Sequence, residues 1–204
     1  MSRIEELIAG QRAYFESGET LEPAFRKRQL EALSGAIDHH YDQLLDALAH
    51  DLGKPVFESI VSEIGMVADE AAFAARRLRS WVKPRRVKTR LRNQPGISHV
   101  RARPHGVSLI LGARNYPLQL TLAPLVGAIA AGNCAVVKPS DIATRSSEVL
   151  AKVLRGIFDE NYVAVVEGGV EVGKELLRQQ FDFIFFTGSA ATGKAVMRAA
   201  AEHL

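Results

Sequence analysis

The sequence predicts an α/β fold, in which a parallel sheet with helices on both faces follows a group of N-terminal helices and a two-stranded arm. Three observations predict it. Apolar residues recur at helical spacing through residues 1–84, residues 85–104 alternate in short steps, and residues 105–204 contain four short apolar runs, each followed by a helical pattern. These three segments are the expected divisions of the chain.

The N-terminal segment is expected to form three helices. Ser2 and Glu5 have the spacing of a capping box at the start of the first helix, which Gly18 ends. The next two apolar patterns cover residues 23–53 and 57–81, and each is bounded by glycine or proline. We expect these helices to be the first part of a cofactor-binding domain.

The arm is strongly basic. Residues 86–93 and 97–104 read as two strands joined by a "QPG" turn, and residues 76–103 carry eleven Lys or Arg and no acidic residue. A nucleic-acid patch is one interpretation. A solvated or subunit-contacting ribbon is favoured instead, because Trp81 is the only Phe, Tyr or Trp in this stretch. No nucleic-acid partner is expected.

The C-terminal segment repeats a strand–helix pattern. Because its strands are apolar throughout, they are expected in a parallel, Rossmann-like sheet that is covered on both faces. In such sheets, ligands bind beyond the carboxyl ends of the strands. The expected strands are 107–111, 134–139, 162–168 and 181–188, and the expected helices are 118–132, 146–158, 169–180 and 192–204.

The sole cysteine and the absence of long apolar runs limit the class of protein. Cys134 cannot form an intrachain disulfide, which suits a reducing, cytoplasmic compartment. It begins a buried-type strand, where a cysteine is more often a small apolar residue than a nucleophile. No run reaches about 18 apolar residues, the mixed-charge N-terminus is unlike a signal peptide, and no metal site is expected.

Three strand ends carry polar or flexible residues. The Asn115 amide could donate a hydrogen bond to a substrate oxygen that gains negative charge during a reaction. Alternatively, Asn115 caps the next helix, and its spacing alone favours this second role. Lys138 and Asp141 could together hydrogen-bond a ribose. Alternatively, Lys138 is solvated and Asp141 belongs to a turn or caps a helix. Gly168 and Gly169 read as a plain turn.

The last strand end, Gly188 to Lys194, fits the G-x-x-x-x-G-K pattern of a P-loop. However, Ala195 stands where a P-loop has the Ser or Thr that holds Mg²⁺. A helix N-terminus here favours an anion, Ser189 adds a hydroxyl, and Gly193 lets the helix approach the sheet. The residues alone therefore indicate a mononucleotide or dinucleotide site.

Three motifs together carry a resemblance to a known family. "HDLGKPVFESIVSEIG", "NYPLQLTLAPLVGAIAAGNCAVVKPSD" and "FFTGSAATGKAVMRAAAEHL" resemble the aldehyde dehydrogenase superfamily, and in particular its class 3-like branch. The resemblance implies NAD(P)-dependent oxidation of an aldehyde to a carboxylic acid. It also implies that the arm pairs subunits, in a homodimer or against a full-length relative.

The resemblance also assigns roles to individual residues. It implies that Asn115 is the amide of the oxyanion hole. Lys138, with Asp141 in place of a usual Glu, would hold the adenosine ribose. The pyrophosphate turn would comprise Gly188, Ser189 and Gly193.

The chain departs from the family pattern in several places. Arg114 replaces a usual tryptophan, and Thr192 replaces a usual valine. The shorter acid at Asp141 leaves the choice between NAD and NADP open. Neither Cys134 nor Glu202 stands where the family has its nucleophile or its general base. We therefore expect a truncated aldehyde dehydrogenase fold that lacks the catalytic domain and is inactive alone. The alternatives are a non-catalytic NAD(P)-binding or docking module and, less favoured, a P-loop nucleotide binder.

Overall fold

The computed structural model describes residues 2–203, and it confirms the α/β fold. Its main sheet is parallel, with the strand order β5-β4-β3-β6. Leu111 pairs with Lys138 at one end of the central strands, and Val107 pairs with Cys134 at the other. The strands are β3 (Val107–Leu111), β4 (Cys134–Lys138), β5 (Val163–Val165) and β6 (Phe183–Phe186).

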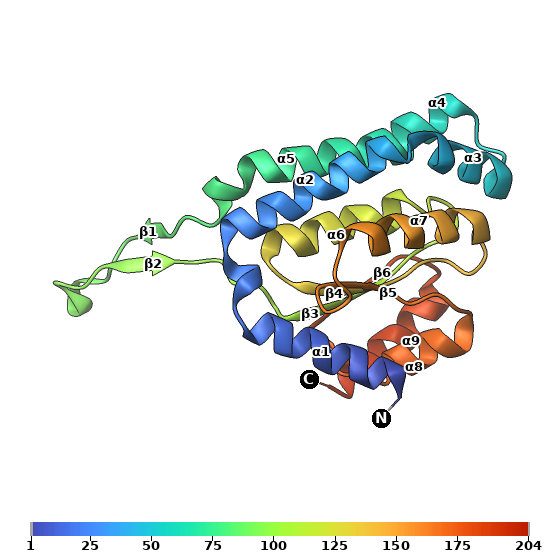
Figure 1. Ribbon diagram of the computed structural model, residues 1–204. Helices are drawn as coiled ribbons and strands as arrows, with labels where there is room; N and C mark the ends of the chain where they lie inside the picture. Colours follow the sequence, from blue (N-terminus) through green and yellow to red (C-terminus); the bar gives the residue numbers. More distant parts are fainter. Residues whose placement is uncertain (1, 204) are drawn as a thin grey trace.

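Helices cover both faces of this sheet, as predicted (Figure 1). On one face lie α6 (Gln119–Ala131) and α7 (Thr144–Ile157). On the other lie α8 (Val170–Leu177), α9 (Ala190–Ala201) and the first helix of the chain, α1 (Arg3–Glu16). Two further N-terminal helices, α2 (Pro23–His39) and α5 (Gly65–Trp81), form an outer layer over α6.

The N-terminal helices differ from the expectation in two details. The capping box of α1 is confirmed, with the Ser2 N–H 2.9 Å from Glu5 Oε2. The predicted helix 23–53 is divided at His40, whose backbone leaves the helical region and whose Nδ1 lies 3.0 Å from the Ala36 oxygen. The predicted helix 57–81 contains a π-helical turn. The remaining short elements are η1 (Glu19–Leu21), α3 (Tyr41–Leu52), α4 (Val56–Ser59) and the π-helical η2 (Ile60–Ile64).

The arm projects away from the body of the molecule (Figure 1). Its strands β1 (Arg85–Val87) and β2 (Ser98–Val100) are antiparallel and pair over three residues each. They are shorter than the predicted 86–93 and 97–104, and a 3₁₀ turn, η3 (Leu91–Asn93), lies between them. Such a ribbon buries little apolar surface of its own, so nothing sustains longer pairing.

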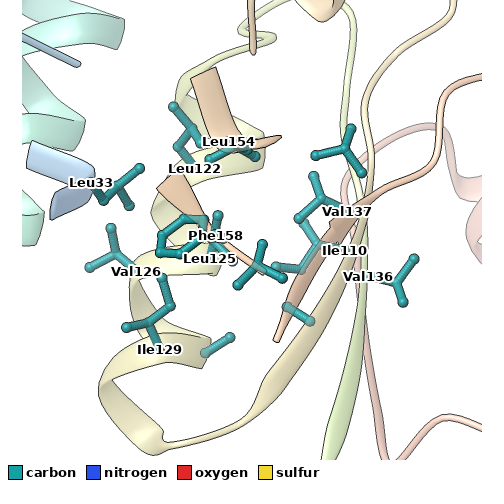
Figure 2. Close-up of a cluster of buried hydrophobic side chains, with 14 of the residues drawn as sticks. Leu33, Ile110, Leu122, Leu125, Val126, Ile129, Val136, Val137, Leu154 and Phe158 are labelled. Atoms are coloured by element: carbon teal, nitrogen blue, oxygen red, sulfur yellow. The ribbon is translucent and has the colours of Figure 1, made fainter. Parts of the chain in front are cut away.

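One hydrophobic core joins the N-terminal helices to the sheet (Figure 2). Side chains of α6 lie between the sheet residue Ile110 and Leu33 of α2. Leu125 and Ile129 of α6 are fully buried, and each such side chain stabilises the fold by about 1.5–3 kcal/mol. Polar links add to the apolar ones, because Gln11 Nε2 of α1 donates to the Ala135 oxygen of β4 at 2.9 Å.

Candidate functional site

The strand order places three of the predicted strand-end sites at one edge of the sheet. The chain moves from β3 to β4 to β5 in one direction, and then crosses to the other side of β3 to form β6. Ligands in such sheets bind where the order reverses, outside the carboxyl ends of the strands. Asn115 follows β3, Lys138 ends β4, and Gly188 follows β6. A 2.9 Å hydrogen bond from the Gly112 N–H to the Lys138 oxygen ties the first two strand ends together.

Asn115 lies in the exposed bend between β3 and α6. The prediction that it caps the following helix is wrong. Helix α6 has Leu118 at its N-cap position, without a side-chain cap from that residue. The Glu63 carboxylate of η2 performs this role, and its Oε2 accepts hydrogen bonds from the N–H groups of Leu118 (2.8 Å) and Gln119 (3.3 Å). Among residues 2–203, no hydrogen bond engages the Asn115 amide, so it is able to donate to a ligand.

Lys138 is buried, so the interpretation as a solvated lysine is wrong. The residue is 8% exposed, and its Nζ has one weak bond, at 3.4 Å, to the oxygen of the adjacent Pro139. Burial lowers the pKa of Lys138, and the nearby carboxylate of Asp141 opposes that shift. The Lys138 ammonium and the Asp141 carboxylate therefore attract each other. An additional hydrogen-bond acceptor, such as a ligand oxygen, would stabilise the buried ammonium.

Asp141 is exposed, and its side chain does not cap the next helix. Helix α7 follows Ala143, and the N–H groups of Arg145 and Ser146 donate to Asp51 at 3.3 and 2.7 Å. Instead, Asp141 Oδ2 faces Gly169, at 3.5 Å from where a Cβ on that glycine would lie. A cavity of about 220 Å³ opens beside it. Its lining comprises Pro139, Ser140, Asp141, Thr144, Ser147, Glu148, Glu167, Gly168 and Gly169.

The carboxylate of Asp51 stays ionised well below neutral pH. Burial raises the pKa of Asp51, but hydrogen bonds from Ser146, His50 and the Arg145 N–H outweigh burial and hold the pKa below its ordinary value. The helix dipole of α7 favours the same charged form. Asp51 thus neutralises the N-terminus of α7 with a fixed negative charge.

The turn between β6 and α9 is short and does not form a P-loop. Ser189 is the N-cap of α9, and its Oγ accepts from the Thr192 N–H at 3.2 Å. The Gly193 N–H already donates to the Ser189 oxygen at 2.9 Å, so Gly193 and Lys194 lie within the helix. A P-loop needs these residues in an open loop whose N–H groups cradle phosphate. The P-loop interpretation therefore does not fit.

Helix α9 offers the more favourable anion site at this edge of the sheet. Glu63 and Asp51 occupy the N-termini of α6 and α7, and α8 carries Glu171 in its first turn. The first turn of α9 carries no acidic residue, and within residues 2–203 the N–H groups of Ala190 and Ala191 have no protein acceptor. Free N–H groups and an uncompensated dipole favour a phosphate there.

Cys134 is a core residue. It is fully buried at the start of β4, at the opposite edge of the sheet from the strand ends described above. Burial raises the pKa of the thiol to about 12, so the thiolate required of a nucleophile does not form near neutral pH. Glu202 follows α9 in an exposed position. Arg114 is exposed beside Asn115, and the Thr192 hydroxyl lies 2.9 Å from Ser189 Oγ.

Sequence reasoning missed Glu63 and Asp51, the two carboxylates that cap α6 and α7. Glu63 had a detectable signal, because it lies in an apolar stripe with Ile60, Ile64 and Val67, where an exposed acid is not expected. Within residues 2–203, no group of three or more metal-ligating side chains is present, and no helix is long and apolar enough to cross a bilayer.

Comparison with known proteins places this geometry in a family. The model of the aldehyde dehydrogenase family matches residues 2–204. Aldehyde dehydrogenase family 3 member B1 of Rattus norvegicus is 46% identical over 204 residues, and 4,4'-diaponeurosporen-aldehyde dehydrogenase of Staphylococcus aureus is 40% identical. All of this chain aligns, but it covers 44% of each of these two proteins.

Solved structures agree with the sequence comparisons. The substrate-bound structure of Staphylococcus aureus AldH superposes with a TM-score of 0.98 at 40% identity, over 100% of this chain and 44% of that one. The NAD⁺ complex of an aldehyde dehydrogenase from Bacillus cereus superposes with a TM-score of 0.85 at 25% identity, over 98% of this chain and 41% of that one. The chain belongs to the aldehyde dehydrogenase family, with relatives among its family 3 members, and it spans less than half their length.

Proposed function

We propose that residues 1–204 form the part of an aldehyde-oxidising enzyme that binds the adenosine and pyrophosphate groups of NAD(P) and supplies the oxyanion-hole amide. The observation that carries this proposal is the open N-terminus of α9 at the point where the strand order reverses. Of the four helices that begin at this edge, α9 is the one whose first turn has neither an acidic residue nor a carboxylate cap within residues 2–203.

The residues present fit the adenosine end of the cofactor. The poorly bonded ammonium of Lys138 and the Asp141 carboxylate suit the hydroxyl groups of a ribose, and the adjacent cavity of about 220 Å³ admits part of a nucleoside. Gly188 and Ser189 lead to the N–H groups of α9, which suit the pyrophosphate. Asp141 and a 2′-phosphate would repel each other, so NADP⁺ is expected to bind more weakly than NAD⁺. The cofactor complex of the Bacillus cereus relative supports a nicotinamide cofactor.

The reaction requires groups outside residues 1–204. The nicotinamide of the cofactor, held through its adenosine and pyrophosphate by Lys138, Asp141 and the start of α9, would supply the acceptor for the hydride of the aldehyde carbon. Asn115 would donate its amide hydrogen to the substrate oxygen as that oxygen gains negative charge. The sole cysteine is buried and protonated, which supports a nucleophile supplied by another part of the enzyme. We therefore expect no aldehyde oxidation by the 204-residue chain alone, and steady NADH formation by the purified chain would refute this.

A cofactor titration with paired lysine variants tests the binding site. By isothermal calorimetry we expect NAD⁺ to bind the wild-type chain weakly. Lys138→Met should weaken binding at least tenfold, and Lys194→Met, which changes an exposed lysine of α9, should leave it within about twofold. No binding of NAD⁺ or NADP⁺ to wild type would refute the cofactor proposal. Mg²⁺-dependent ATP binding that Lys194→Met abolishes would instead favour the P-loop alternative.

A second role, docking to another subunit through the arm, is supported by the apolar side chains that the arm exposes. Residues 85–104 extend from the body and expose Leu91 (88%), Ile97 (61%) and Val100 (50%) among many cations. Exposed apolar side chains in this setting favour a partner surface. Analytical ultracentrifugation should show association in the wild-type chain and a monomer for the double variant Leu91→Asp and Ile97→Asp. An unchanged sedimentation coefficient in the double variant would refute docking through the arm.

A further inference from the structure

A buried ion pair lies beneath the loop that carries Asn115. Lys54, from the connection between α3 and α4, forms a hydrogen-bonded salt bridge with Glu63 of η2. Their side chains are 8% and 0% exposed. Replacing a buried pair by well-packed apolar residues is often neutral or stabilising, so stability alone is a weak reason for two buried charges. The pair needs a second explanation, and its contacts supply one.

Glu63 fixes the end of the loop that precedes α6. Its Oε2 accepts the N–H groups of Leu118 and Gln119, while its Oε1 faces Lys54. The carboxylate therefore sets the position at which the helix begins, with one oxygen on the helix and the other on the lysine. Because Asn115 precedes Leu118 by three residues, any displacement of this cap moves the loop.

Lys54 holds the middle of the same loop. Its Nζ lies 3.7 Å from the centre of the Tyr116 ring, within the range of a cation–π contact, and Tyr116 is the residue after Asn115. The backbone carbonyl oxygen of Tyr116 in turn accepts a hydrogen bond from the Leu120 N–H at 2.9 Å. The loop is thus held on the C-terminal side of Asn115 by two groups that are bonded to each other.

The backbone around Glu63 has an uncommon geometry. Residues 60–64 form a π-helical turn, in which the Gly65 N–H bonds to the Ile60 oxygen. A Cβ on Gly65 would lie 2.8 Å from that oxygen, so the turn requires glycine. Such turns are frequent at functional sites. The turn provides the backbone that carries Glu63, fully buried, to the N-terminus of α6.

We propose that Lys54 and Glu63 are positioning residues for Asn115, and that their ion pair fixes residues 112–118 so that the Asn115 amide faces the reacting oxygen. This rests on the proposed role of Asn115 in aldehyde oxidation. The pair itself touches neither substrate nor cofactor. It acts through the Tyr116 ring and the start of α6.

The test measures the order of the loop in the 204-residue chain. The variants are Glu63→Gln, which removes the carboxylate charge that serves both the cap and the ion pair, Tyr116→Leu, which removes the ring contact, and Lys54→Arg, which keeps a cation. Asp51→Asn is the matched control, because Asp51 caps α7 in the same way as Glu63 caps α6. NMR relaxation of the Asn115 backbone N–H and hydrogen exchange at Leu118 are recorded for each variant, together with an NAD⁺ titration.

We expect the order parameter of the Asn115 N–H to fall below about 0.6 in Glu63→Gln and Tyr116→Leu, from about 0.85 in wild type. Exchange at Leu118 should rise at least tenfold in Glu63→Gln. Lys54→Arg should retain wild-type order, and Asp51→Asn should affect the start of α7 alone. If Glu63→Gln does not fold, Tyr116→Leu still decides the question, since it removes a half-buried ring and leaves the cap intact.

Wild-type order at Asn115 in Tyr116→Leu, or in a folded Glu63→Gln, would overturn the inference. The NAD⁺ titration separates this outcome from failure of the proposed function. Lys138 and Asp141 do not contact the ion pair, so each folded variant should bind NAD⁺ within about threefold of wild type. Failure of wild type to bind either NAD⁺ or NADP⁺ would refute the cofactor proposal, whereas the relaxation data would still decide whether the pair orders the loop.

Discussion

Replacing Gly193 by alanine should stabilise the protein. Gly193 lies in the first turns of α9, where its N–H is bonded to Ser189. An added Cβ would lie 3.5 Å from Phe186 Cε1, which is an ordinary van der Waals contact. Alanine is favoured over glycine within a helix by about 0.5–1 kcal/mol. For a chain of this size, that corresponds to a rise in Tm of about 1–4 °C.

Gly188→Ala is the matched comparison, because the same ring lies beside it. A Cβ on Gly188 would lie 2.5 Å from Phe186 Cζ, so the ring or the turn must move. Such overpacking costs about 1–3 kcal/mol. Thermal unfolding followed by circular dichroism should therefore give opposite shifts in Tm for the two variants. A lower Tm for Gly193→Ala would refute the packing argument.

Gly193→Ala also tests whether Gly193 contacts the cofactor. Its N–H is already used within the helix, and its Cβ would point towards Phe186, so NAD⁺ affinity should stay within about threefold in Gly193→Ala. The resemblance to the family predicts instead that Gly193 belongs to the pyrophosphate turn. A tenfold loss of affinity with an unchanged or raised Tm would mean that the phosphate approaches Gly193 directly.

Three further outcomes are expected. Asp51→Ala should lower the free energy of unfolding by about 1 kcal/mol through loss of the α7 cap. Because the pKa of Asp51 is lowered in the folded state, this difference should be full above about pH 4 and should fade as the pH falls through that lowered pKa, and urea unfolding at several pH values checks it. A pH-independent difference would contradict the charge argument. Iodoacetamide should alkylate Cys134 at pH 8 at least a hundredfold more slowly in the folded than in the unfolded chain, and rapid labelling of folded protein would contradict its burial. Leu125→Ala in α6 should cost about 2–5 kcal/mol in chemical denaturation, and a cost below 1 kcal/mol would show that the core shown in Figure 2 relaxes around it.

The sequence predicted the fold where the signal was local. The strands and helices of residues 105–204 follow from short apolar runs and helical spacing, and the structure contains each of them, with somewhat different bounds. The π-helical turn was not predicted, because Ile60, Ile64 and Val67 keep the spacing of an ordinary amphipathic helix across it.

The caps of α6 and α7 were not predicted, because they act over long separations in the chain. Glu63 lies 55 residues before Leu118, and Asp51 lies 95 residues before Ser146. Reasoning from spacing examines only the few residues before each helix, so Asn115 and Asp141 were the available candidates. Both side chains are instead left to face solvent at the strand ends. A local pattern cannot distinguish a capping side chain from one that is free to bind a ligand when the true cap comes from another part of the fold.

The N-terminal helices therefore do more than cover the sheet. Glu63 and Asp51 both belong to the stretch from α3 to η2, and their carboxylates accept the first N–H groups of α6 and α7. Those helices would otherwise compete with α9 for an anion, since each presents the same dipole and free N–H groups at the same edge of the sheet. With these N–H groups of α6 and α7 already bonded to carboxylates, the start of α9 keeps free N–H groups, and Lys138 lies on the other side of β3. The carboxylates of Asp51 and Glu63 thus leave α9 as the helix start that is open to an anion, and under the proposed function residues 1–84 and 105–204 would act together in binding the cofactor.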